Sequence, residues 1–384
     1  MKVMTVVGTR PEIIRLSRVI LRLDQHVDHT LVHTGQNWDR QLNEVFFEDL
    51  ALRPPDYHLG VDVSSLGRVL GDVLAKIEPV LQEVRPDAFL VLGDTNSCIA
   101  AIMAKRLGIP VFHMEAGNRC FDENVPEETN RRLIDHVADF NLCYTEHARR
   151  NLLAEGLHPR RVYVTGSPMR EVLDAYADQI ESSDALDRHE LTPGGYLLVS
   201  MHREENVDNP ENLGGLLQAI VSLQASMGLR VVVSTHPRLR DRLERQEPRV
   251  DISTLELAEP FGYLDFVKLQ RNARCVVSDS GTISEESAIL GFPAITIRNA
   301  IERPEALDAG SLILTGLASE AIERAVQLVV SDWDAGHLSE MPIEYQVRDC
   351  SHRVVRLITG LAGLHHQWSN VEPRFLSLPE ADKV

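Results

Sequence analysis

The chain has 384 residues, of which 43% are apolar and 25% charged, a balance typical of a globular protein with two domains or one large one. The net charge of −18 argues against nucleic acid as a partner, because a phosphate backbone requires a basic face. Charges at Arg10 and Glu12 come too early for a signal peptide, and no apolar run could span a membrane, so we expect a cytoplasmic protein with no membrane partner. The five cysteines are odd in number and form no C-x-x-C pair, which indicates reduced thiols and no zinc site.

Short apolar runs alternate with amphipathic stretches in the first half of the chain. The predicted strands are 2–7, 29–34, 88–92 and 111–114. The predicted helices are 11–23, 66–84, 97–107 and 127–137. This β–α–β alternation predicts a parallel sheet with helices on both faces.

The same pattern restarts further along the chain. The predicted strands are 196–201, 230–234, 275–278 and 294–297. The predicted helices are 210–227, 263–272 and 283–290. We predict an α/β fold with a first domain at 1–168, a second at 169–350, a helix at about 351–364 that packs back on the first domain, and a tail at 365–384. Two Rossmann-like domains are expected to face a cleft at the carboxyl ends of their strands, where ligands bind in open α/β sheets.

Three carboxylates stand at the expected edge of the first sheet. Asp94 follows strand 88–92, Glu115 follows strand 111–114, and Glu127 opens a helix. Simpler uses exist, since Asp94 could cap a helix and Glu127 could pair with Arg131 four residues later. A glutamate directly after an apolar strand is costly unless it lines a cleft or finds a partner. Clustered acids also shift one another's pKa values, which suits a reaction that removes one proton and delivers another.

Other strand ends carry groups that suit a phosphorylated ligand. Arg10 follows the first strand in a loop that is not G-x-G-x-x-G, so the dinucleotide fingerprint is absent there. His202 and His236 each follow a strand of the second domain. The turn 280–282 leads from a strand into a helix, where backbone N–H groups and two hydroxyls predict a diphosphate site. An ordinary Ser-capped helix with an acidic first turn explains the same residues.

Taken together, these segments resemble the non-hydrolysing UDP-N-acetylglucosamine 2-epimerase family. The matching stretches are, in family order, 8–12, 93–95, 115–117, 126–128 with 130–131, 202–203, 279–281 with 285–286, and 302–305. Each stretch alone is weak evidence for the family, but the whole set in this order is specific to it. The resemblance implies a glycosyltransferase-B type fold, a homodimer and a UDP-sugar substrate. We expect no cofactor and no metal, because no His/Asp cluster has metal-ligand spacing.

The resemblance also implies roles for individual residues. Those that match the family's catalytic positions are Asp94, Glu115, Glu127 and His202. Those expected to contact the UDP-sugar are Arg10, Arg15, Arg131, His236, Phe266, Ser280, Gly281, Thr282, Glu286 and Arg303. Thr282 replaces the usual glycine, so only its backbone contribution is expected, and Arg15 stands where many members have lysine.

The expected reaction interconverts UDP-N-acetylglucosamine and UDP-N-acetylmannosamine by elimination of UDP to a 2-acetamidoglucal and re-addition. The segments 34–39, 112–114 and 118–125 resemble instead a subgroup that forms UDP-N-acetyl-L-fucosamine from a 6-deoxy-L-hexosamine in capsule and O-antigen pathways. Two other classes fit the same architecture, a glycosyltransferase and a non-catalytic nucleotide-sugar sensor. An NAD-dependent epimerase is disfavoured by the missing glycine fingerprint.

Overall fold

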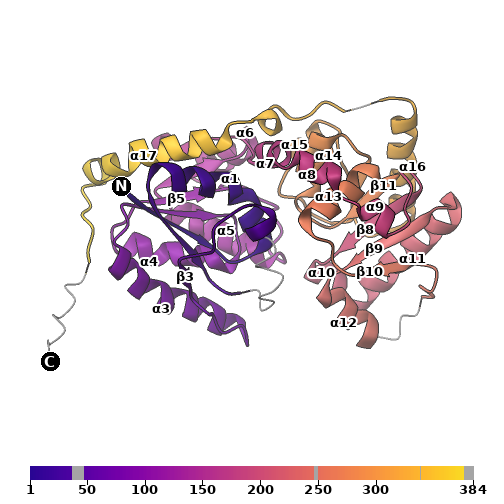
Figure 1. Ribbon diagram of the computed structural model, residues 1–384, viewed down its shortest axis with the longest axis horizontal. Coiled ribbons are helices and arrows are strands. Elements are labelled where there is room, and N and C mark those ends of the chain that lie inside the picture. The colour runs from indigo at the N-terminus through magenta and orange to yellow at the C-terminus, as the bar shows by residue number, and fades with distance from the viewer. Residues whose placement is uncertain (37–46, 246–249, 338, 376–384) are drawn as a thin grey trace. The chain divides into compact units, whose positions relative to one another are not determined.

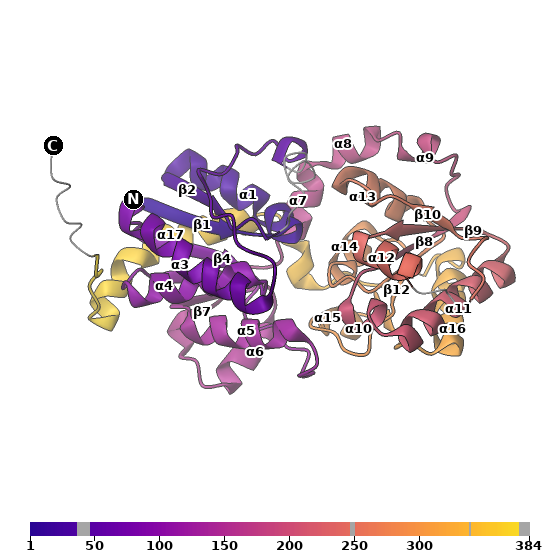
Figure 2. The same ribbon diagram turned by 90° about the horizontal axis from the view of Figure 1, so that it is seen from below.

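The computed structural model describes residues 1–36, 47–245, 250–337 and 339–375. The chain forms two compact units, each built around one parallel β-sheet (Figures 1 and 2). Unit 1 comprises Met1–Arg119, Glu123–Val172 and Val347–Val384, and unit 2 comprises Cys120–Asp122 and Leu173–Gln346. The chain thus passes into unit 2 after Val172, where 168 was predicted. In the described part of the chain, no helix is long and apolar enough to cross a membrane.

The sheet of unit 1 has seven strands in the order β3-β2-β1-β4-β5-β6-β7. The strands are β1 (Lys2–Val7), β2 (Asp28–His33), β3 (Tyr57–His58), β4 (Ala88–Leu92), β5 (Val111–Met114), β6 (Phe140–Cys143) and β7 (Val162–Val164). All neighbouring pairs are parallel. Strands β4 and β5 are buried along their whole length, as expected for a sheet covered on both faces.

Helices cover both faces of this sheet. They are α1 (Arg10–His26), α3 (Leu66–Val84), α4 (Ala101–Arg106), α5 (Pro126–Val137), α6 (Glu146–Ala154), α17 (Cys350–Ser369) and the 3₁₀ turns η1 (Asn96–Ala100) and η2 (Pro159–Arg161). Helix α7 (Met169–Ala175) begins in unit 1 and ends in unit 2. Helix α17, from the end of the chain, runs along α1 on one face, and α3 and α4 lie on the other (Figure 1). Apolar residues of α3, η1 and α4 form one core cluster with β1, β4 and β5.

The sheet of unit 2 has six parallel strands in the order β10-β9-β8-β11-β12-β13. The strands are β8 (Tyr196–Met201), β9 (Arg230–Thr235), β10 (Glu256–Ala258), β11 (Cys275–Ser278), β12 (Ala294–Thr296) and β13 (Ile313–Leu314). The helices are α8 (Ala177–Ser182), α9 (Ala185–Arg188), α10 (Glu204–Val207), α11 (Pro210–Met227), α12 (Pro237–Arg245), α13 (Tyr263–Asn272), α14 (Ile283–Leu290), α15 (Glu305–Asp308), α16 (Ser319–Asp334) and the 3₁₀ turn η3 (Ile343–Gln346). Helices α11 and α16 pack side by side over one core cluster, and α9 and α13 contribute to the other (Figure 2).

The structure corrects two predictions at the level of elements. The stretch 97–107 is not one α-helix, because it begins as the 3₁₀ turn η1 before α4. The stretch 365–384 is not wholly a loose tail, because α17 continues to Ser369 and the Arg374 N–H donates to the Leu107 carbonyl at 2.7 Å. The side chain of Phe375 also packs against the core of unit 1.

Candidate active site

Asp94 and Glu115 leave the sheet of unit 1 at the same edge. Strands β4 and β5 are neighbours, and Leu92 is aligned with Met114, so the next residues of both strands emerge together. Gly93 and Glu115 have φ values of 72° and 64°. The left-handed conformation is uncommon for a glutamate and costs on the order of 1 kcal/mol or more. Two sharp turns therefore bring two predicted catalytic carboxylates out of adjacent strands.

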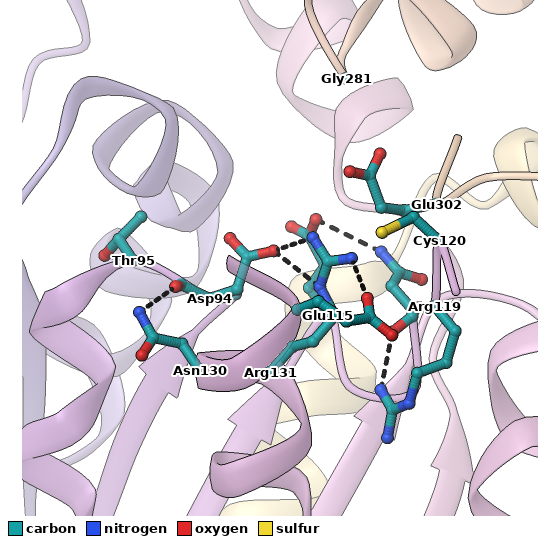
Figure 3. A network of polar contacts seen from close by, with 12 residues as sticks. Asp94, Thr95, Glu115, Arg119, Cys120, Asn130, Arg131, Gly281 and Glu302 are labelled. Carbon is teal, nitrogen blue, oxygen red and sulfur yellow. Dashed lines mark hydrogen bonds and ion pairs between the residues drawn. The ribbon is translucent and has the colours of Figure 1, made fainter. Parts of the chain in front are cut away.

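Arg131 and Asn130 of α5 hold the Asp94 loop (Figure 3). The Arg131 guanidinium donates from Nε and Nη2 to the same oxygen, Asp94 Oδ2, at 3.0 and 2.6 Å. The Asn130 amide donates to the Asp94 backbone carbonyl at 2.9 Å. Since the Asp94 side chain is 25% exposed while that of Arg131 is 4% exposed, the arginine is a fixed support and the carboxylate is accessible.

The Glu115 carboxylate is held in the same manner by a different arginine. Arg15 of α1 forms an ion pair with Glu115 Oε2, and both side chains are at least nine-tenths buried. The Arg15 guanidinium also lies 5.9 Å from the centre of the Tyr144 ring, within cation–π range. The amide of Asn118 donates to the other carboxylate oxygen at 3.4 Å. Arg15 was predicted to contact the ligand, and in this structure it orients Glu115.

The first turn of α5 holds a third carboxylate, Glu128, which contacts Arg131. Arg131 pairs with Glu128 Oε2 at 2.7 Å, and Glu128 is 3% exposed. Glu127, the predicted catalytic residue, lies one position earlier and is only half-buried. The prediction overlooked Glu128, although its spacing of three from Arg131 and seven from Asp135 places all three on one helix face.

The loop after β1 depends on another carboxylate, Glu12, to which the sequence analysis assigned no role. Glu12 is 1% exposed and accepts the Gly8 and Thr9 N–H groups at 2.9 and 2.7 Å, with the hydroxyls of Thr9 and Ser97. Burial raises the pKa of Glu12 above its usual value, even though these hydrogen bonds favour the charged form. Arg10 begins α1 in this loop and is half-buried.

His202 and Asp279 form the corresponding strand-end pair of unit 2. Strands β8 and β11 are neighbours, and Asp279 is fully buried after β11. The carboxylate accepts the His202 and Arg203 N–H groups at 3.0 Å and lies 3.0 Å from His202 Nδ1. Burial alone would raise the pKa of Asp279, but His202, the Arg203 N–H and the Asn206 amide outweigh it and lower the pKa. The carboxylate fixes His202 Nδ1 and turns Nε2 outward, with the side chain 40% exposed.

The turn between β11 and α14 has the form expected of a phosphate loop. The hydroxyls of Ser280 and Thr282 lie 3.0 Å apart, and the Gly281 carbonyl accepts Arg303 Nη1 at 2.9 Å. A Cβ atom on Gly281 would lie 2.7 Å from that nitrogen, so a larger residue here would displace the Arg303 guanidinium. Arg303 also faces Glu285 at 3.3 Å.

The remaining residues of unit 2 that were predicted to contact the UDP-sugar differ in burial and in their partners. Glu286 is buried and accepts the Gln270 amide at 2.8 Å, an arrangement that fixes its carboxylate. Phe266 is half-buried and stacks on Phe261 at 6.4 Å, and the exposed His236 ring lies 6.3 Å from that of His202. Among the described residues, no group of three or more His, Cys, Asp or Glu side chains could hold a metal ion.

Comparison with known proteins decides the family. The family model described as UDP-N-acetylglucosamine 2-epimerase matches residues 20–359. The chain belongs to the UDP-N-acetylglucosamine 2-epimerase family. The resemblance carried by the ordered motifs is thereby confirmed, and the chain is an isomerase by family.

Solved structures of this epimerase family share the fold over almost the whole chain. The UDP-N-acetylglucosamine 2-epimerase of Rickettsia bellii is 44% identical, with a TM-score of 0.88 over 96% of this chain and 98% of that one. The Methanocaldococcus jannaschii UDP-GlcNAc 2-epimerase in complex with UDP-GlcNAc and UDP is 34% identical, with a TM-score of 0.88 over 94% of this chain and all of that one. The predicted α/β fold with two Rossmann-like domains of the glycosyltransferase-B type is confirmed.

A third relative carries a different substrate in its name. The UDP-2,3-diacetamido-2,3-dideoxy-D-glucuronate 2-epimerase of Pseudomonas aeruginosa is 34% identical over 327 residues, which cover 84% of this chain and 90% of that protein. The family therefore includes members named for more than one hexosamine, so the sugar must be argued separately from the reaction.

Proposed function

We propose that this protein is a non-hydrolysing UDP-N-acetylhexosamine 2-epimerase that interconverts UDP-N-acetylglucosamine and UDP-N-acetylmannosamine. The observation that carries the proposal is the pair of carboxylates, Asp94 and Glu115, at the ends of neighbouring strands with a separate arginine on each. The M. jannaschii family member with UDP-GlcNAc and UDP bound supports the same substrate here.

The chemistry requires an elimination because C2 of a hexosamine is not adjacent to a carbonyl group. A base removes the C2 proton, its electron pair forms the C1–C2 double bond, and the C1–O bond breaks to release UDP and leave a 2-acetamidoglucal. UDP then adds back to C1, and an acid delivers a proton to the opposite face of C2. Two faces need two proton carriers, and general acid–base groups of this kind each contribute about 10²–10⁴-fold.

We assign these proton transfers to the two strand-end carboxylates. Both Arg131 contacts end on Asp94 Oδ2, so we propose that Oδ1 exchanges the proton. Glu115 serves the other face, and Glu127 is the alternative partner. In unit 2, His202 Nε2 would stabilise the departing diphosphate, while the turn 280–282 and Arg303 would hold it with N–H groups and positive charge. Arg10, Phe266, His236 and Glu286 would complete the UDP site.

Deuterium incorporation tests the reaction. The protein is incubated with UDP-N-acetylglucosamine in D₂O without acceptor or NAD, and the product is followed by NMR. We expect deuterium at C2 and a product of manno configuration. A glycosyltransferase or a nucleotide-sugar sensor would return the substrate undeuterated.

The identity of the sugar is tested in parallel. The same exchange is measured with the 6-deoxy-L-hexosamine substrate of the UDP-N-acetyl-L-fucosamine pathway and with UDP-2,3-diacetamido-2,3-dideoxy-D-glucuronate. The substrate with the highest kcat/KM is the assigned one. Absence of C2 exchange with all three compounds would refute the proposed function. Of the segments that suggested the 6-deoxy sugar, residues 37–39 lie outside the described part of the chain.

A further inference from the structure

A buried histidine–aspartate pair lies directly beneath the two carboxylate loops. His113 of β5 and Asp135 of α5 are both 0% exposed, with His113 Nδ1 2.9 Å from Asp135 Oδ1. The other ring nitrogen, Nε2, lies 2.8 Å from the Gly93 carbonyl oxygen. Neither residue was given a role by the sequence motifs.

The partners determine the protonation of the histidine ring. A carbonyl oxygen only accepts hydrogen bonds, so His113 Nε2 must carry a proton. Asp135 Oδ2 accepts Arg119 Nη1 at 2.7 Å, and the Gly117 N–H lies 3.1 and 3.2 Å from the two carboxylate oxygens. These donors favour an ionised carboxylate, which in turn requires a proton on His113 Nδ1. The geometry therefore indicates a doubly protonated His113.

This pair fixes the backbone on which both carboxylates stand. The Gly93 carbonyl belongs to the peptide group that leads into Asp94, and it is held by His113. The Gly117 N–H follows Glu115 by two residues, and it is held by Asp135. Gly93, Glu115 and Gly117 all have positive φ, at 72°, 64° and 84°. A backbone in such conformations persists only where its surroundings hold it.

We propose that His113 and Asp135 are positioning residues of the epimerase reaction, and that a doubly protonated His113 and an ionised Asp135 hold the loops of Asp94 and Glu115 at the separation the proton transfers require. The inference rests on the proposed function. A displacement of a reacting group by about 1 Å costs on the order of 10²-fold in rate, so small shifts of these loops suffice for a large effect.

The charges around His113 agree with this assignment. Burial by itself lowers the pKa of His113, but the hydrogen bond and charge of Asp135, the Gly93 carbonyl and the charge of Asp94 outweigh it and raise the pKa. Arg119 faces Asp135 from the other side and is itself held by Glu155 at 2.7 Å. The positively charged ring of His113 thus contacts hydrogen-bond acceptors at both nitrogens, and the Asp135 carboxylate lies between it and Arg119.

Two substitutions of His113 separate its two hydrogen bonds. His113→Asn keeps a donor close to the position of Nδ1 and loses the bond to Gly93, whereas His113→Gln keeps a donor close to Nε2. We expect His113→Asn to lower kcat by about 10²-fold while KM for the UDP-sugar changes by less than about threefold, since most of the proposed UDP contacts are residues of unit 2. His113→Gln should recover a large part of kcat.

The matched control is another His–Asp pair of unit 1. His29 of β2 is 1% exposed on its side chain and lies 2.6 Å from Asp24, at the amino end of its strand and away from the carboxylate loops. His29→Gln should lower the unfolding temperature yet leave kcat unchanged. Equal losses of kcat in His29→Gln and His113→Asn would show general destabilisation and overturn the proposal.

A measurement on the unmodified protein covers the case in which His113 variants do not fold. With [¹⁵N]histidine labelling, the His113 ring should show two protonated nitrogens at pH 7. Its signals are assigned by their loss in His113→Gln or, where that variant does not fold, by their displacement in Asp135→Asn. One unprotonated ring nitrogen in the wild type, or a His113→Asn variant with a wild-type rate, overturns the proposal. If the wild type itself incorporates no deuterium, the proposed function fails, and the NMR signature still decides the state of the pair.

Discussion

Two of the predicted catalytic carboxylates of unit 1, Asp94 and Glu115, each have a buried arginine as support. Asp94 is held by Arg131 and Glu115 by Arg15, so the acids are oriented before any substrate binds. Such orientation matters because a general acid or base must lie within hydrogen-bond distance of the proton that it transfers. The sequence identified all four residues from their strand and helix positions and from the family pattern, but it did not pair them.

Removal of either carboxyl charge should stop turnover without loss of UDP binding. Asp94→Asn and Glu115→Gln keep the shape and the hydrogen bonds to arginine, so we expect kcat to fall by about 10²–10⁴-fold. UDP affinity, measured by calorimetry, should remain unchanged. The control is Asp72→Asn, which breaks an ion pair with Lys76 on α3. A near-normal rate in either carboxylate variant would refute the acid–base assignment.

A buried histidine of β2 should make the protein less stable in mild acid. His33 is 2% exposed, its Nδ1 accepts the Gly35 N–H at 3.0 Å, and burial with the nearby His58 lowers its pKa to about 4. Between about pH 6.5 and pH 4 the unfolded chain binds a proton that the folded chain excludes, so stability falls as pH falls, by on the order of 3 kcal/mol in total.

The slope of stability against pH measures this effect. Denaturant midpoints are compared for the wild type and His33→Asn, whose side-chain oxygen replaces Nδ1 as the acceptor and does not titrate. The variant should show a smaller loss between pH 6.5 and pH 4. Parallel curves for the two proteins would contradict the assignment.

At the scale of elements, the turn after β5 depends on a close approach between two backbones. Gly117 has φ of 84°, and a Cβ atom there would lie 2.3 Å from the Ala148 carbonyl oxygen of α6. Gly117→Ala should therefore destabilise unit 1 by about 1–2 kcal/mol for the left-handed backbone, with a further cost for the contact. We expect a lower unfolding temperature and a lower kcat, because Gly117 adjoins the Glu115 turn.

Gly156 provides the matched control for this substitution. It has φ of 88° in the same unit, and nothing lies within 4 Å of the position a Cβ atom would take. Gly156→Ala should thus show only the backbone cost. If both variants shift the unfolding temperature equally, the approach of α6 to Gly117 is not the cause.

At the scale of the whole molecule, unit 1 is completed by the end of the chain. Helix α17 packs along α1, and its Val354, Ile358 and Ala362 are almost fully buried at spacings of four residues. The Ser351 hydroxyl and N–H bond Glu171, which fastens the start of the helix. The folding of unit 1 therefore requires residues from both ends of the sequence.

Truncation of one buried side chain of α17 should destabilise unit 1 specifically. Ile358→Ala should cost about 2–5 kcal/mol, because it removes a fully buried branched side chain. Limited proteolysis should then cleave unit 1 at a lower temperature than unit 2. Leu364→Ala on the same helix, where the side chain is 38% exposed, should have a small effect. Equal effects would refute the packing role of α17.

Homodimer formation remains a prediction of the family resemblance, and a cytoplasmic location remains a prediction from the sequence composition. Light scattering of the purified protein should give about twice the chain mass of 43.0 kDa. A mass of one chain would remove the dimer from the proposal and leave the chemistry of each subunit unaffected.

The sequence by itself determined the fold class, most of the main strands and helices, and the residues at their strand ends. It could do so because buried strands and amphipathic helices have different apolar periods, and because turns and caps use characteristic residues. Short edge strands such as β3 and β13 gave too few residues for a period, and the switch from 3₁₀ to α-helix before α4 left no mark in composition.

Only the tertiary structure decided which charges meet. Asp94 lies 37 positions from Arg131, and Arg15 lies 100 positions from Glu115. Such pairs depend on strand order and on the helix that crosses between strands, which no local pattern encodes. For the same reason His113 and Asp135 looked like ordinary residues of a buried strand and a helix, until the fold placed them beneath both carboxylate loops.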